Sequence, residues 1–202
     1  MGLSIHYSGR IKDYALIDAM KAEVEDICKS LEWPVQFYDA ASSELRPGET
    51  AEVYSPDDVR GISFRPPKCE PVYLTFLPDR SLCSPVKLIY YDPITNADLI
   101  ELVHTKTQEA GPDTHIAILK LLHYLKQKYF ESFELNDEGY YWEKWDKKIL
   151  LSQFARYNLM LDKLSAALAD VKLAPGESVE SLTDRIEDII KKKFDSQDDS
   201  NG

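Results

Sequence analysis

The residues from Asp113 to Phe130 constrain the fold of this 202-residue chain more strongly than any other segment. Side chains suited to a protein core recur there at spacings of 3, 4, 3 and 4 residues, which places them on one face of an α-helix. They are His115, Ile118, Leu122, Leu125 and Tyr129. Asp113 or Thr114 can cap the helix by accepting a hydrogen bond from its free amides. The sequence therefore predicts an amphipathic helix that packs against a core.

An aromatic and acidic segment follows this helix. Phe133 to Leu135 and Tyr140 to Trp142 flank the turn sequence Asn136-Asp-Glu-Gly139, in which Gly139 can supply the positive φ of a hairpin loop. We therefore expect a β-hairpin, on which alternate side chains face opposite sides. The candidate binding residues are Tyr140, Tyr141, Trp142, Trp145, Asp137 and Glu138. They can line a ligand groove or a protein interface, or else pack between the preceding helix and the next one.

The first 110 residues predict alternating short elements. Apolar residues from Leu16 to Leu31 recur at helical spacings of 4, 4, 3 and 4, and Pro34 ends that helix. The expected strands are residues 4–7, 35–38, 62–64, 72–77 and 86–91, the last three forming an antiparallel meander. Residues 40–60 predict a long surface loop with a short edge strand near Tyr54. Residues 99–103 are ambiguous between helix and strand.

The carboxyl-terminal residues predict two helices joined at Pro175-Gly176. A stripe that suits pairing with one other helix begins near Asp146 and comprises Leu150, Phe154, Tyr157, Leu161, Leu164 and Leu168. The final helix, residues 178–194, can supply that partner within the chain. We therefore expect a monomer rather than a homodimer formed through the stripe.

These elements together predict an α+β protein. We expect an N-terminal β-α-β element and antiparallel strands in one mixed sheet backed by helices, with a C-terminal helical pair. The expected organisation is an α+β domain over residues 1–146, a helical hairpin packed on it over residues 147–194, and a disordered tail over residues 195–202.

Charge and cysteine content narrow the classes of partner and location. The formal net charge is −11, and residues 1–110 carry 11 Lys and Arg against 18 Asp and Glu, so no half of the chain is basic. Such a chain suits a basic protein partner better than nucleic acid, whose binding depends on Lys and Arg contacts to phosphate. Three cysteines without Cys-x-x-Cys spacing predict neither a disulfide framework nor a cysteine zinc site. No stretch predicts a signal peptide or a membrane span, so we expect a cytoplasmic location.

Glycine spacing argues against cofactor binding. Phosphate-binding loops need glycines within about five positions of one another. Here no two glycines lie closer than Gly2 and Gly9. We therefore expect no nucleotide cofactor.

The histidines provide the candidates for metal or proton chemistry. Glu101-Leu-Val-His104 has the Glu-x-x-His spacing of di-iron helical bundles, but the chain contains one copy where that chemistry needs two. A mononuclear site using Glu101, His104 and His115 is the remaining metal hypothesis. His115 and His123 are eight residues apart, about 12 Å along a helix, so they cannot bind one ion together. The alternative for His115, which lies on the apolar stripe, is a neutral core or capping histidine.

Two functional hypotheses follow from these observations. The first is a non-catalytic intracellular binding or regulatory protein that acts on a basic protein partner through the aromatic segment. The second is a metal-assisted hydrolase with its site near Glu101, His104 and His115.

Overall fold

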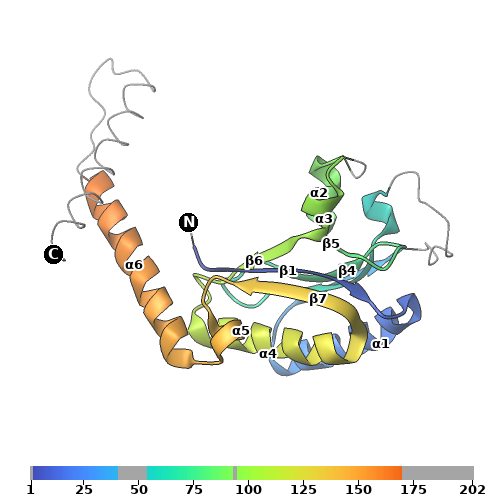
Figure 1. Cartoon of the computed structure of the whole chain (residues 1–202), viewed down its shortest axis with the longest axis horizontal. Coiled ribbons are helices and arrows are strands. Elements are labelled where there is room, and N and C mark those ends of the chain that lie inside the picture. Colours follow the sequence, from blue (N-terminus) through green and yellow to red (C-terminus); the bar gives the residue numbers. More distant parts are fainter. Residues whose placement is uncertain (1, 41–53, 93–94, 170–202) are drawn as a thin grey trace, which may run out of the picture. The chain divides into compact units, whose positions relative to one another are not determined.

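The computed structural model describes residues 2–40, 54–92 and 95–169, and these residues form an α+β fold as the sequence predicts (Figure 1). The strands are β1 (Ser4–Ile11), β2 (Val35–Asp39), β3 (Arg60–Phe64), β4 (Val72–Phe76), β5 (Leu82–Cys83), β6 (Val103–Lys106) and β7 (Phe130–Asp137). The helices are η1 (Tyr14–Leu16), α1 (Ile17–Ser30), η2 (Pro56–Asp58), α2 (Pro85–Tyr90), α3 (Ala97–Glu101), α4 (Pro112–Tyr129), α5 (Tyr141–Lys144) and α6 (Lys147–Ala169). The predicted final helix and tail lie outside the described residues, and so does most of the predicted 40–60 loop.

The described strands form two antiparallel sheets, so the prediction of one mixed sheet is wrong. One sheet has the order β6-β1-β7 and the other β2-β3-β4-β5, with an isolated bridge between Arg10 and Ser81 joining them. The chain does run β1-α1-β2, but α1 carries it to the edge of the second sheet rather than to a parallel neighbour of β1. Both neighbours of β1 are antiparallel to it.

The core lies between the sheets and the helices α1 and α4, which run along one face (Figure 1). Each helix turns one face inward, as the periodicity predicts. The fully buried residues of these two helices include Met20, Val24 and Cys28 on α1, and His115, Ile118, Leu122 and Leu125 on α4. On the sheet, Ile5 and Tyr7 of β1 are buried as well. Among the described helices, η2, α2 and α3 lie on the opposite side, next to the four-stranded sheet (Figure 1).

The predicted strand at residues 86–91 is wrong, because this segment forms helix α2. The Ser84 hydroxyl accepts a hydrogen bond from the Lys87 amide at 3.4 Å, and Pro85 occupies the first helical turn. Both features favour a helix start. The ambiguous residues 99–103 divide between two elements, with α3 ending at Glu101 and β6 beginning at Val103.

The predicted hairpin after α4 is also wrong. Strand β7 pairs with β1, and the residues after it form helix α5. The Asp137 carboxylate causes this change, because it accepts hydrogen bonds from the amides of Gly139, Tyr141 and Trp142 and so starts a helical turn. The positive φ falls on Tyr140, at 58°, and not on Gly139. A Cβ at residue 139 would lie 2.4 Å from Leu150 Cδ1 and 3.0 Å from Asp137 Oδ1, so a larger residue there would displace the buried Leu150 side chain.

The predicted helix beginning near Asp146 is present as α6. The chain divides into two compact units, residues 1–154 and residues 155–202, and the boundary falls within this helix. Leu150 and Phe154 are buried in the first unit. They therefore anchor the start of α6 to the α+β fold.

We predict that Gly61→Ala destabilises the protein by about 3 kcal/mol, since φ there is +148° and a Cβ would lie 2.2 Å from the Leu74 carbonyl oxygen. Urea unfolding measures the effect. The control is Ser63→Ala on the same buried strand, which adds no atom and should change stability by about 1 kcal/mol. Equal effects of the two substitutions would contradict the close approach of β3 and β4 at Gly61.

Candidate functional site

The outer face of the three-stranded sheet carries polar side chains that no described helix covers (Figure 1). Side chains alternate along β1, so Ile5 and Tyr7 point into the core while His6 and Ser8 point outward. The antiparallel register places His104 of β6 directly opposite His6. Asn136 of β7 lies opposite His6 on its other side. Residues from three strands that are distant in sequence therefore share one open surface.

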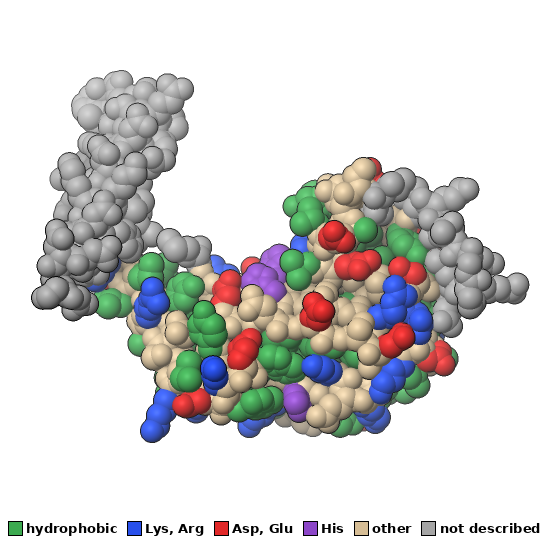
Figure 2. Space-filling model, viewed as in Figure 1, with side chains coloured by type: hydrophobic (Ala, Val, Ile, Leu, Met, Phe, Trp, Pro, Cys, Tyr) green, Lys and Arg blue, Asp and Glu red, His purple; other side chains and the backbone are tan. Residues whose placement is uncertain are grey.

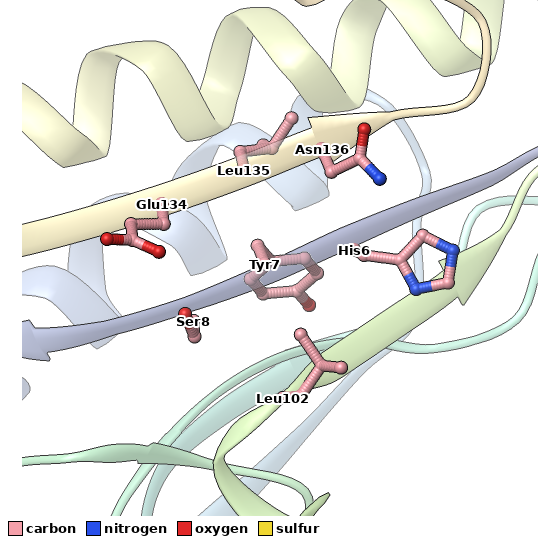
Figure 3. Close-up of a pocket in the computed structure, with 7 residues that line it drawn as sticks. All are labelled: His6, Tyr7, Ser8, Leu102, Glu134, Leu135 and Asn136. Atoms are coloured by element: carbon pink, nitrogen blue, oxygen red, sulfur yellow. The ribbon is translucent and has the colours of Figure 1, made fainter. Parts of the chain in front are cut away.

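A shallow cavity of about 360 Å³ lies on this face (Figure 3). Its lining residues are His6, Tyr7, Ser8, Leu102, Glu134, Leu135 and Asn136. The Tyr7 hydroxyl is already engaged, because it donates to the Tyr73 carbonyl and accepts from the Tyr73 amide, both at 3.0 Å. Burial raises the pKa of Tyr7, so this phenol stays neutral and serves the core.

His6 is held in place by a carboxylate. Its Nε2 lies 3.1 Å from Glu138 Oε1, and the other carboxylate oxygen of Glu138 accepts from the Ser4 amide at 2.8 Å. The rings of His6 and His104 have centroids 6.1 Å apart. The open face thus contains two imidazoles and one carboxylate that is fixed by the backbone.

His104 lines a second cavity. The second cavity, of about 280 Å³, is lined by Arg65, Glu70, Pro71, Tyr73, Ser84, Val86, Lys87 and His104. Burial and the nearby Lys87 ammonium both lower the pKa of His104, so its ring is neutral at physiological pH. Lys87 itself is occupied, since its Nζ donates to the carbonyls of Leu99 and Leu102 at 2.8 and 2.6 Å.

An exposed apolar surface, which we call the α2–α3 surface, borders these cavities. It comprises Val86, Ile89, Tyr90, Tyr91, Leu99 and Leu102. Ile89 and Tyr90 are 65% and 78% exposed. Figure 2 shows hydrophobic and acidic side chains side by side where α2 and α3 rise from the sheet, with histidine side chains at their foot. The sequence did not predict this surface, because residues 86–91 were expected to form a strand.

The three residues of the metal hypothesis have separate surroundings. His104 is on the open face beside His6, whereas His115 is fully buried below the sheet. The pKa of Glu101 is raised by burial and then by Asp79. Within the part of the chain that the structure describes, no three His, Cys, Asp or Glu side chains gather closely enough to hold a metal ion together.

His115 belongs to a buried hydrogen-bonded network. Its Nδ1 lies 2.7 Å from the Thr107 hydroxyl, and its Nε2 lies 2.9 Å from Asp137 Oδ1. Burial would raise the pKa of Asp137, but hydrogen bonds from His115 and from backbone amides outweigh it, so the pKa lies below its usual value. Both side chains are fully shielded from solvent. A network that is closed to solvent and satisfied by its own hydrogen bonds is typical of a structural role, in keeping with the alternative that His115 is a core histidine.

The predicted binding residues near α5 divide into buried and exposed groups. Tyr141 and Asp137 are buried, whereas Tyr140 and Trp145 are 51% and 45% exposed. Trp142 is half-buried against α4, where its ring contacts that of His123 with centroids 5.5 Å apart. Trp145 has a positive φ of 52°, as Tyr140 does at the other end of α5. We call the exposed Tyr140 and Trp145, together with the half-buried Trp142, the aromatic corner.

None of the helices in the described residues combines the length and apolar character that a membrane crossing requires. Comparisons with protein-family models, with curated proteins and with solved structures find no match to this chain.

We predict that Asp137→Asn destabilises the protein by about 3 kcal/mol at pH 7, because it removes the charged partner of His115 and weakens the acceptor for three amides. A carboxyl whose folded pKa is lowered stabilises the fold above its unfolded pKa of about 3.9, and this contribution is lost as pH falls through the folded pKa. The stability difference between the two proteins should therefore shrink below about pH 4. Urea unfolding at a series of pH values measures it.

The control for this series is Asp113→Asn, which removes an exposed carboxylate from the first turn of α4. It should change stability by about 0.5 kcal/mol or less. A constant difference between wild type and Asp137→Asn from pH 7 to pH 3 would contradict the lowered pKa.

Proposed function

We propose that this chain is a non-catalytic binding protein that recognises a basic, amphipathic segment of a protein partner through the α2–α3 surface. The observation that carries the proposal is the exposure of six large apolar side chains, each at least 40% exposed, between residues 86 and 102. Contiguous exposed apolar surface on a folded protein is typical of interaction sites.

The α2–α3 surface is anchored from beneath. Leu88 of α2 and Ile100 of α3 are buried in a small apolar cluster with Val59, Leu77 and Cys83. The Lys87 side chain further ties α2 to the carbonyls at the end of α3. The exposed residues therefore project from a supported pair of helices, as a preformed binding surface requires.

Charge favours a basic partner. Asp92 and Asp98 are exposed beside the apolar residues, and the chain as a whole carries a net charge of −11. The nearest basic side chain within these helices, Lys87, already bonds two carbonyl oxygens. A segment that combines apolar side chains with Lys or Arg would complement both features.

The two earlier hypotheses have weaker support. The aromatic corner has two side chains that are at least 40% exposed, Tyr140 and Trp145, against six on the α2–α3 surface. The hydrolase hypothesis needs Glu101, His104 and His115 to converge, and His115 is buried on the opposite side of the sheet from His104. Binding at the α2–α3 surface therefore remains the better account.

We predict that peptides selected from a random displayed library for binding to the full chain combine apolar residues with Lys or Arg. Their affinity should fall about ten-fold or more in the double variant Ile89→Ser, Tyr90→Ser, because these are the most exposed apolar side chains of the surface. Binding should also weaken at higher salt. Titration calorimetry measures both effects.

The matched control is Trp145→Ser, which removes an exposed aromatic side chain from the aromatic corner and should leave affinity unchanged. The double variant should unfold within about 0.5 kcal/mol of wild type, since its side chains contribute little to the core. Loss of binding in Trp145→Ser with retention in the double variant would overturn the assignment to the α2–α3 surface. Selection of acidic peptides would overturn the basic partner.

A further inference from the structure

Two histidines that are far apart in the sequence, His6 and His104, lie next to each other on the open face of the three-stranded sheet. His6 of β1 and His104 of β6 are paired in the antiparallel register. Their neighbours Ile5 and Thr105 are fully buried, which fixes both strands and the outward direction of both imidazoles. Figure 3 shows the ring of His6 leaning from β1 over β6.

Glu138 selects the tautomer of the neutral His6 ring. A carboxylate only accepts hydrogen bonds, so the His6 Nε2 that lies 3.1 Å from Glu138 Oε1 is the protonated nitrogen. In the neutral ring the lone pair is then on Nδ1. The Ser4 amide holds the Glu138 carboxylate at 2.8 Å, so its position is set by the backbone of β1. This is the arrangement by which carboxylates orient metal-binding histidines.

The separation of the rings suits a shared ion. An ion about 2.1 Å from one nitrogen of each ring lies about 3.2 Å from each centroid, so two ligating rings have centroids at most about 6.4 Å apart. The observed separation is 6.1 Å. This value is near that upper bound, so tetrahedral binding would require the exposed His104 side chain to change rotamer and bring the rings closer.

We propose that His6 and His104 together bind one divalent transition-metal ion, of the kind that prefers imidazole ligands, such as Zn²⁺ or Cu²⁺. Glu138 acts as a positioning residue for His6. Two protein ligands leave the other coordination positions to water, for which the cavities beside His6 and His104 provide room. A pair of this kind is distinct from a cluster of three or more ligands, and it needs neither Glu101 nor His115.

The test is titration of the full chain with Zn²⁺ by calorimetry. The wild type should bind one ion, and His6→Ala and His104→Ala should each lose affinity about ten-fold or more. Glu138→Gln should weaken binding by about ten-fold while leaving both ligands in place. His123→Ala is the control, because His123 packs against Trp142 and Trp145 and takes no part in the pair. Circular dichroism checks that each variant is folded, and His6→Gln replaces His6→Ala if the alanine variant unfolds.

Cu²⁺ provides a second measurement, because its electron paramagnetic resonance spectrum reports coupling to ligating nitrogens. The wild type should show two imidazole nitrogens, and either histidine variant should show one. Absence of Zn²⁺ binding, unchanged Zn²⁺ affinity in either histidine variant, or coupling to a single nitrogen in the wild type would each overturn the proposal. None of these results bears on peptide binding at the α2–α3 surface, which is a separate test.

Discussion

The fold depends on one buried carboxylate, that of Asp137. It receives hydrogen bonds from the His115 ring and from the amides of Gly139, Tyr141 and Trp142, so it joins the start of α4, the end of β7 and the whole of α5. Thr107 extends the same network to the segment that follows β6. A buried carboxylate is stable only when its acceptor capacity is met, and four donors meet it here. The position of three secondary-structure elements thus follows from a single side chain.

This arrangement decides which surfaces are free. The network pulls α4 and the aromatic segment to the inner face of the three-stranded sheet, where α4 buries His115, Ile118, Leu122 and Leu125. Because the chain turns into α5 directly after β7, it adds no further described strand beyond β7, and no described helix covers the outer face. The outer face therefore keeps its polar side chains, and α2 and α3 stand beside it with their own apolar residues exposed.

The sequence predicted the features that local periodicity defines, of which helix α4 is the clearest. The stripe from His115 to Tyr129 identified α4 and the burial of His115, because a spacing of 3.6 residues needs no knowledge of the partner surface. It could not predict that Asp137 would start a helix, since that depends on His115, 22 residues earlier, meeting the carboxylate in the core. The apolar run at residues 86–91 was assigned as a strand because short runs carry no reliable period. The Ser84-Pro85 pair before it was the available sign of a helix start.

The candidate site residues show the same contrast between features that follow from local spacing and features that depend on contacts distant in sequence. The Glu101-x-x-His104 spacing implied a shared helical face, but α3 ends at Glu101 and His104 lies in a strand, so the spacing has no geometric meaning here. His104 instead pairs with His6, a residue 98 positions away, through a register that only the assembled sheet defines. Strand β6, which carries His104, begins directly after Leu102 of the α2–α3 surface. His104 lines the same cavity as Val86, and Leu102 lines the cavity beside His6. The histidine pair and the α2–α3 surface therefore border one another.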